Sequence, residues 1–243
     1  MERLRGIVLR TVKYGDSSII IDMLTDGRGR MSVITRRTSR PSADRSRIAP
    51  SHLMPLSLLE FDCNIHGQGR LPHPNTIICY HPYTTLQSHP VKATLALFIA
   101  EFLSYALKEE TANHLLYDYL EQSFRWLDTA EHQFANFHLV LLMRLTRFIG
   151  IMPSTQKTDS THYFDLMNSE YTTVQPPHSH FLQPDEASRL PYMLHMDYDN
   201  MHLYALSRHQ RRRCLEIINE YYRLHLPGFR ELQSIEILSE VFG

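Results

Sequence analysis

At 243 residues, the chain is long enough for one large domain or two smaller ones, and its 43% hydrophobic and 21% charged residues are ordinary for a globular protein. Three cysteines without close spacing (Cys63, Cys79 and Cys214) argue against a disulfide framework and fit a reducing cytosol. Neither a signal peptide nor an apolar run long enough to span a membrane is visible. We therefore expect a soluble cytoplasmic protein.

The net charge of −1 hides an asymmetry along the chain. Residues 1–50 hold 11 Lys and Arg against 5 Asp and Glu, whereas the remaining residues hold 14 against 21. Five arginines and no acidic residue lie between Asp26 and Asp44. This segregation indicates a module that binds a polyanion, joined to a more acidic region. The alternative is a basic face that is merely solvated.

The first eighty residues alternate between apolar and polar residues, as β-strands do. We expect five strands, at residues 5–15, 17–26, 30–37, 56–67 and 75–83. Short strands separated by turns suggest a small closed barrel, for which the five-stranded OB-fold is the first candidate and an SH3-like barrel the alternative. Cys63 falls on the apolar face of the fourth strand and is expected in the core.

From about His89 the spacing of apolar residues becomes helical. Further helices are expected at 113–128, 132–150, 207–226 and 232–242, and a hairpin at 163–174. Ser207 and Gln210 form a predicted capping box. We therefore expect an α+β protein, with an OB-fold domain at 1–82 and an all-helical domain at 83–243 that contains a loop-rich insert at about 151–190.

The basic residues of the barrel define a predicted DNA-binding site. In an OB-fold the second and third strands and the flanking loops bind oligonucleotides, and the planar guanidinium of arginine suits phosphate groups. About three to five phosphate contacts would give log–log salt slopes of roughly −2 to −4 for single strands. The predicted residues are Arg28, Arg30, Arg36, Arg37, Arg40, Arg45 and Arg47, with Lys13 and Arg10 on the first strand and Arg70 between the last two strands.

Aromatic residues are scarce in this region, since Tyr14 and the imidazole of His52 are the only rings in residues 1–60. Many single-strand binders stack bases on several aromatic side chains. We therefore expect binding that is dominated by the DNA backbone and independent of sequence. Such binding suits strand annealing, because the bases stay free to find their complements.

A second basic cluster begins the 207–226 helix and consists of Arg208, Arg211, Arg212 and Arg213. Positive charge at a helix N-terminus is unfavourable, so these side chains need an acidic partner. Glu216 and the acidic residues at 185–199 are candidates within the chain. DNA or an acidic peptide is the external alternative.

Sequence motifs of enzymes are absent: the chain has no Walker loop, no Gly-x-Ser-x-Gly elbow and no His-Glu-x-x-His. We expect a non-enzymatic protein without a cofactor. Two other hypotheses remain, an OB-fold protein that binds RNA and a thiol- or histidine-dependent enzyme. The enzyme hypothesis predicts an activity that is lost when Cys79 or His178 is changed.

Three stretches, in order and spread over nearly the whole chain, resemble the bacterial RecO family of recombination mediators. The first, GIVLRTVKYGDSSIIIDMLTDGRGRMSVITR, has Thr25, Gly27 and Gly29 near the family's threonine-x-x-glycine turn. The second, RRTSRPSADRSRIAP, resembles the family's basic loop after the third strand. The third, YYRLHLPGFRELQSIEILSEVF, resembles its C-terminal end.

The resemblance implies a nucleoid-associated DNA repair and recombination protein. Such a protein binds single- and double-stranded DNA, anneals complementary strands and helps to load the recombinase onto DNA coated by single-strand-binding protein (SSB), in the RecF pathway. The implied protein partners are a RecR-like protein, RecF and the acidic, hydrophobic-ended C-terminal tail of SSB. Arg144, Arg147 and Phe148 are the candidate residues for binding that tail.

The chain departs from the family pattern in one segment. Many members of the family carry a four-cysteine zinc module after the third helix, but residues 153–181 contain no cysteine. Zinc needs four closely grouped ligands, and this segment offers only His162, His178 and His180 as alternatives. We therefore expect no metal ion.

Overall fold

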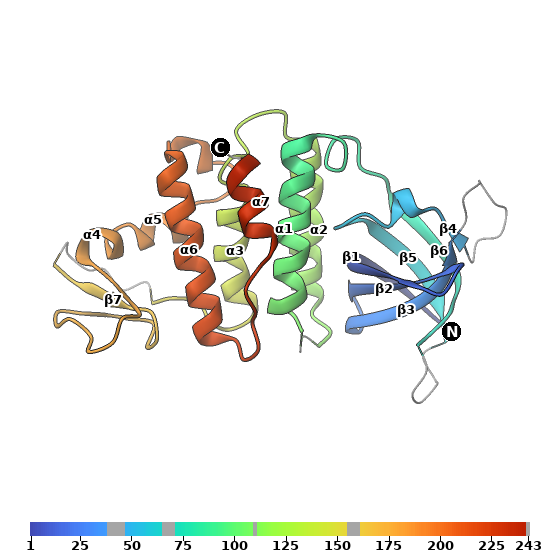
Figure 1. Ribbon diagram of the computed structural model, residues 1–243, viewed down its shortest axis with the longest axis horizontal. Helices are drawn as coiled ribbons and strands as arrows, with labels where there is room; N and C mark the ends of the chain where they lie inside the picture. The colour runs from blue at the N-terminus through green and yellow to red at the C-terminus, as the bar shows by residue number, and fades with distance from the viewer. Residues whose placement is uncertain (38–46, 65–70, 109–110, 155–160, 242–243) are drawn as a thin grey trace. The chain divides into compact units, whose positions relative to one another are not determined.

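A computed structural model describes residues 1–37, 47–64, 71–108, 111–154 and 161–241. The chain divides into two compact units. The first contains Met1–Thr129 and the C-terminal helix α7 (Ser234–Val241), and the second contains Ala130–Glu231 (Figure 1). The predicted division into an OB-fold domain at 1–82 and a helical domain at 83–243 stays a prediction.

The first unit begins with a β-barrel. Its strands are β1 (Glu2–Tyr14), β2 (Ser18–Thr25), β3 (Gly29–Arg37), β4 (Arg47–Ile48), β5 (Leu58–Cys63) and β6 (Pro74–His81). They are ordered β4-β3-β2-β1-β5-β6, with every pair antiparallel except β3–β4. The backbone N–H of Ile34 in β3 donates to the carbonyl of Pro72, just before β6, at 3.0 Å and closes the barrel. The OB-fold prediction and its five strands are confirmed, whereas β4 and a short 3₁₀ turn, η1 (Pro50–His52), were not expected.

Alternation along the strands explains why the barrel has one core. Ile21 and Met23 of β2, Val33 of β3 and Phe61 of β5 are all fully buried inside it. Cys63 is also fully buried there, as predicted. A bulge between Val8 and Arg10 shifts the register of β1. Bulges bend a strand, which here lets the two halves of β1 follow different sides of the barrel.

Helices α1 (Pro90–Ala106), α2 (His114–Thr129) and α7 complete the first unit. The helix α1 contacts both β1 and α7, which accounts for its nearly continuous apolar sequence. The Glu101 carboxylate on α1 accepts the backbone N–H groups of Gln233 and Ser234 at 3.0 and 2.9 Å. This carboxylate satisfies N–H groups that the first turn of α7 cannot pair by itself.

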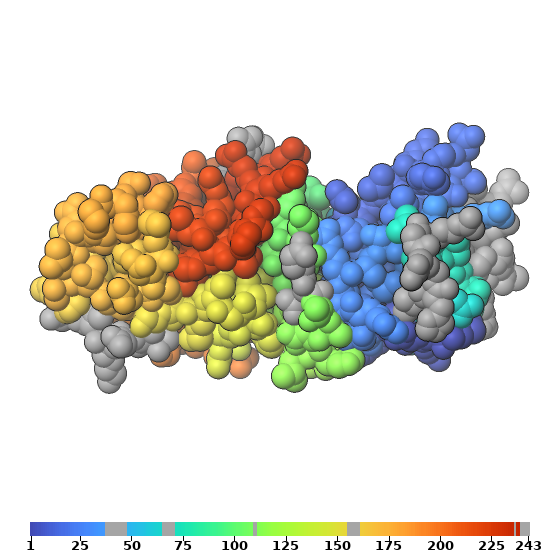
Figure 2. Space-filling view, turned by 90° about the horizontal axis from the view of Figure 1, so that it is seen from below, coloured from blue at the N-terminus to red at the C-terminus, as the bar shows by residue number. Residues whose placement is uncertain are grey.

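The second unit is built around α3 (Phe137–Phe148) and α6 (Arg208–His225). Between them lie a small sheet, with the order β8-β7-β9, and two short helices. These elements are β7 (Tyr163–Asp165), β8 (Glu170–Thr172), β9 (Phe181–Leu182), α4 (Pro184–Ala187), α5 (Leu190–His195) and the 3₁₀ turn η2 (Met201–Leu203). The predicted hairpin is β7–β8, whereas β9, α4 and α5 were not predicted. Figure 2 shows this yellow-to-orange segment directly against α6.

The start of α6 is fixed by the predicted capping box. Ser207 Oγ accepts the backbone N–H of Gln210 at 3.2 Å, and Gln210 Oε1 accepts the backbone N–H of Ser207 at 2.8 Å. The prediction is confirmed. Within the described residues, no helix is both long enough and apolar enough to cross a membrane.

Candidate nucleic-acid interface

The β2–β3 turn is built by the threonine and glycines of the sequence motif. Thr25 Oγ1 donates to the carbonyl of Gly29 at 2.8 Å and accepts the backbone N–H of Arg28 at 3.2 Å. Gly29 has φ 65°, a conformation that residues with a side chain rarely adopt. A Cβ at Gly27 would lie 2.9 Å from Leu4 Cδ2. The motif therefore fixes the turn between two strands of the predicted site.

Arginines at this end of the barrel are paired with carboxylates. The Arg28 guanidinium contacts both carboxylate oxygens of Glu2, the nearest at 2.8 Å. Arg30 Nη2 lies 2.6 Å from Asp22 Oδ2, and Arg30 also donates to the carbonyl of Ser104 on α1. These two predicted DNA-binding residues therefore have protein partners that offset their charge.

Arg5 on β1 belongs to the same end of the barrel. Its Nε lies 3.2 Å from Asp26 Oδ2, and its Nη1 lies 3.3 Å from Glu121 Oε2 on α2. The guanidinium also lies over the ring of Tyr117, 5.3 Å from its centroid. Arg5 thus joins the barrel to α2 within the first unit, which gives this cation a structural use.

The opposite end of the barrel collects cations without such partners. Lys13 and Arg36 are exposed, and neither forms an ion pair with any residue that the structure describes. Strand pairing places Ser18 of β2 opposite both Tyr14 and Arg36, and it places Arg36 beside Arg47 of β4. Three strands, β1, β3 and β4, thus bring basic residues to this end.

Arg10 lies on the outer face, between the two groups. Its Nη2 is 3.7 Å from Asp22 Oδ2, but that carboxylate already holds Arg30 at 2.6 Å. The Arg10 side chain is 65% exposed, so its charge stays largely available. Arg37 follows Arg36 at the end of β3 and pairs with Ile48 of β4. Arg40, Arg45 and Arg70 lie outside the described residues, and the structure says nothing about the side chains of Arg37 and Arg47.

An exposed apolar patch on the same outer face was missed by the sequence interpretation. Tyr14 and Val12 are 59% and 43% exposed. A signal for them existed, because alternation from the exposed Arg10 places Val12 and Tyr14 on the same side of β1. Asp22 as a counter-charge was also missed, although the register from the Thr25 turn places it diagonally across from Arg30.

Most of the basic cluster on α6 has partners inside the second unit. Arg213 contacts Glu186 at 2.6 Å, and Arg212 Nε lies 3.0 Å from Glu216 Oε1. Arg211 donates to Asn136 Oδ1 at 3.1 Å and to the carbonyl of Leu206. Arg208 also has a contact with the protein. A role for this cluster in binding DNA or an acidic partner stays a prediction.

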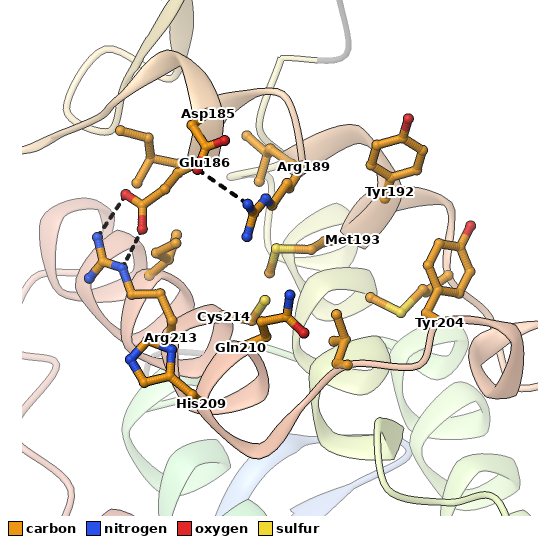
Figure 3. A pocket seen from close by; sticks show the side chains of 15 residues that line it. Asp185, Glu186, Arg189, Tyr192, Met193, Tyr204, His209, Gln210, Arg213 and Cys214 are labelled. Carbon is orange, nitrogen blue, oxygen red and sulfur yellow. Dashed lines mark hydrogen bonds and ion pairs between the residues drawn. The ribbon is translucent and has the colours of Figure 1, made fainter. Parts of the chain in front are cut away.

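A pocket of about 370 Å³ lies between α4, α5 and α6. Figure 3 shows its apolar floor and its charged rim. Met193 and Cys214 lie inside, and the Arg213–Glu186 pair closes one side. Arg189, 3.2 Å from Asp185, forms another part of the rim. The geometry can hold an apolar group that carries a charge or a hydrogen-bonding group at one end.

The thiols do not have the environment of reactive cysteines. Burial raises the pKa of Cys63, Cys79 and Cys214. Reactive cysteines instead have a lowered pKa, because the thiolate is the nucleophile. The thiol-enzyme hypothesis receives no support from these environments.

Two of the three histidines considered as zinc ligands, His178 and His180, have carboxylate partners, and His162 contacts the hydroxyl of Thr161. His178 Nε2 lies 3.3 Å from Asp165 Oδ2, and His180 Nδ1 lies 2.8 Å from Glu220 Oε1. Within the part of the chain that the structure describes, no three His, Cys, Asp or Glu side chains group so as to hold a metal ion.

The residues predicted to bind the SSB tail lie at the end of α3. Arg144 Nη2 is 3.7 Å from Asp197 Oδ2, so its charge is partly offset. Arg147 is exposed and Phe148 is half-buried. An exposed cation beside a partly exposed ring is the combination that an acidic, hydrophobic-ended peptide requires.

Comparison with known proteins identifies the family. A family model described as "Recombination protein O N terminal" matches residues 1–76, and one described as "Recombination protein O C terminal" matches residues 87–233. The chain is 42% identical over 243 residues to "DNA repair protein RecO" of Phocaeicola vulgatus, covering 100% of both chains. It is 42% identical to the protein of that name from Bacteroides fragilis, covering 100% of this chain and 99% of the relative. For the Porphyromonas gingivalis relative the identity is 34%, with 98% of each chain covered. The chain belongs to the RecO family.

Proposed function

We propose that the protein is a non-catalytic DNA repair and recombination mediator that binds single- and double-stranded DNA with the end of its barrel that carries Lys13 and Arg36. The observation that supports this proposal is the difference in unpaired positive charge between the two ends of the barrel. Lys13 and Arg36 are exposed without an ion-pair partner among the described residues, whereas Arg28 and Arg30 are neutralised by Glu2 and Asp22. Unpaired cations on a rigid strand face attract phosphates with little cost of reorganisation.

The proposed activity is annealing of complementary strands and assistance in loading the recombinase onto SSB-coated DNA, in the RecF pathway. Contacts that are made mainly to phosphates do not depend on base sequence. A strand held in this way can still pair with its complement. A RecR-like protein and RecF are the proposed protein partners of this step.

Binding to DNA and to RNA of the same sequence separates this proposal from the RNA-binding hypothesis. We expect both single- and double-stranded DNA to bind, with a log–log salt slope of roughly −2 to −4 for the single strand, because each of about three to five phosphate contacts releases about 0.7 of a counterion. Fluorescence anisotropy of labelled oligonucleotides in a salt series measures both quantities. A marked preference for RNA, or no DNA binding at low salt, would contradict the proposal.

We also propose that Arg147 and Phe148 on α3 bind the acidic C-terminal tail of SSB. Replacing Arg147 by Glu is expected to weaken binding of a labelled tail peptide by at least about tenfold, because a favourable charge contact becomes repulsive. Anisotropy of the peptide measures the loss. Arg230→Glu is the matched control, since Arg230 is an exposed arginine in the same unit.

The pocket of Figure 3 provides the competing location for the tail. Arg189→Glu reverses a charge at its rim without altering α3. If Arg189→Glu releases the peptide and Arg147→Glu does not, the tail occupies the pocket and the α3 proposal is wrong.

A further inference from the structure

The outer face of β1–β2–β3 carries three rows of side chains. Residues directly opposite in antiparallel strands point to the same side of the sheet. The rows that strand pairing defines are Tyr14–Ser18–Arg36, Val12–Ile20–Ile34 and Arg10–Asp22–Ser32. Neighbouring positions in each strand, such as Ile19, Ile21 and Val33, point into the barrel and are buried. The three rows therefore lie on the outward side of the sheet, where Ile34 and Asp22 are buried and the other members are at least partly exposed.

This surface has apolar groups where solvent should favour polar ones. Tyr14 is 59% exposed, Val12 is 43% exposed, and Ile20 is half-buried. Outward positions of an antiparallel sheet that faces water are usually polar. Single exposed apolar residues need no explanation, but these three share adjacent rows and form one patch.

Cations lie on both sides of the apolar patch. Arg36 occupies the same row as Tyr14, and Arg10 lies in the row on the far side of Val12, whereas Lys13 is paired with the inward-facing Ile19 and points to the other side of the sheet. A surface with exposed rings and aliphatic groups between cations is complementary to a polyanion that can also present apolar faces. Single-stranded nucleic acid has this character, because its phosphates are charged and its bases have exposed faces.

We propose that Tyr14 is a base-stacking residue, and that Tyr14, Val12 and Ile20 form a platform that distinguishes an unpaired DNA strand from a duplex. This inference rests on the proposed function and deepens it. Gly15, with φ 63°, starts the turn directly after Tyr14, and among the described residues no atom beyond its chain neighbours lies within 4 Å of the position of a Cβ there, so the exposed Tyr14 stands at the end of β1 beside an open turn. A strand whose phosphates contact Arg36 and Arg10 can place one base on this ring.

The platform accounts for binding two forms of DNA with different strengths. In a duplex the bases are paired and stacked inside, so only the cations can contribute. In a single strand a base can leave its neighbours and stack on Tyr14. Because the patch contains one aromatic ring, most bases of the bound strand stay free to pair, which is compatible with annealing.

The inference is tested on the full chain by comparing protein variants and, for each variant, different DNA ligands. Wild type, Tyr14→Ala and Tyr14→Phe are each titrated with a single strand, with an abasic strand of equal length and with a duplex. Stacking is worth about 1–3 kcal/mol per base, so Tyr14→Ala is expected to weaken binding to the single strand by roughly 5- to 150-fold. The salt slope should stay unchanged, and Tyr14→Phe should bind as wild type does.

The remaining measurements isolate the contribution of the base. For the abasic strand and the duplex, wild type and Tyr14→Ala should bind equally. Tyr192→Ala is the matched control, because Tyr192 is a 61% exposed tyrosine in the second unit, and it should not change any affinity. Circular dichroism checks that each variant is folded.

The possible outcomes separate this inference from the proposed function. If wild type binds no DNA, both the proposed function and the platform are refuted. If wild type binds and Arg36→Ala weakens binding, but Tyr14→Ala changes nothing, the function stands and the platform is refuted. An equal loss for single strand, abasic strand and duplex would also refute it, because Tyr14 would then contribute without contacting a base.

Discussion

Replacing Lys13 and Arg36 together by alanine is expected to lower the affinity for single-stranded DNA about 25-fold at about 0.1 M salt, since each lost phosphate contact removes about 0.7 of a counterion. Both side chains are exposed and have no ion-pair partner among the residues that the structure describes. Their removal leaves no carboxylate unpaired, so the fold should not change. The slope of log affinity against log salt should decrease in magnitude by about 1.4.

The double variant Arg3→Ala/Arg28→Ala is the matched control. It removes the same charge, but its two arginines are paired with Glu60 and Glu2 at the other end of β1. Lys13 lies ten residues from Arg3, about 33 Å along the strand, which is well beyond the Debye length of about 10 Å at 0.1 M salt. The control should therefore lose less than about threefold in affinity. A loss equal to that of Lys13→Ala/Arg36→Ala would show that net charge, not this end of the barrel, determines binding.

Replacing Asp128 by alanine is expected to destabilise the first unit by about 3–5 kcal/mol, because it removes a buried carboxylate that accepts three backbone N–H groups, one of them buried. The Asp128 carboxylate, at the end of α2, accepts the backbone N–H groups of Thr84, Thr85 and Leu86 at 2.7–3.1 Å. These three residues connect the last barrel strand to α1. Urea denaturation followed by circular dichroism measures the loss. Asp118→Ala is the control on the same helix, because its carboxylate is half exposed and lies 3.6 Å from Arg5.

The Asp128 carboxylate also predicts how the stability of the protein changes at acidic pH. Burial alone would raise the pKa of Asp128, but the N–H groups of Thr84, Leu86 and Thr85 outweigh burial and lower the pKa below the ordinary value of an aspartic acid. An acid whose pKa is lower in the folded state contributes stability that is complete above its unfolded pKa. This contribution decreases as the pH falls through the folded pKa. In Asp128→Ala, that part of the acid sensitivity should be absent; an unchanged acid profile would contradict the assignment.

The barrel could be predicted from sequence because its strands keep the period of two. Alternation in β1, β2 and β3 survives since one face of each strand is in the core. The two-residue strand β4 has too few positions to show a period. Likewise β9 and α4 contain two and four residues, and tertiary contacts rather than local pattern determine them.

The basic residues could be located from the sequence, but the carboxylates that pair with each of them could not. In the sequence Arg28 and Arg30 cannot be told apart from Arg36. In the fold, Arg28 forms an ion pair with Glu2 and Arg30 forms one with Asp22. Acidic residues at 185–199 were predicted as candidate partners of the α6 arginines, and Glu186, 27 residues before Arg213, pairs with it, but the sequence could not single this residue out. Ion pairs between distant segments depend on register and topology, which a single sequence does not provide. Because Arg28 and Arg30 are paired and Arg36 is exposed, the candidate site lies toward the end of β3.

The most direct test of the account is annealing of two complementary labelled strands, each coated with the cognate SSB, in a salt series. Wild type should accelerate annealing, salt should slow it, and Lys13→Ala/Arg36→Ala should fail while Arg3→Ala/Arg28→Ala keeps the wild-type rate. If wild type does not accelerate annealing even at low salt, or if the two double variants behave alike, the proposal that the exposed cations at this end of the barrel carry the activity is contradicted.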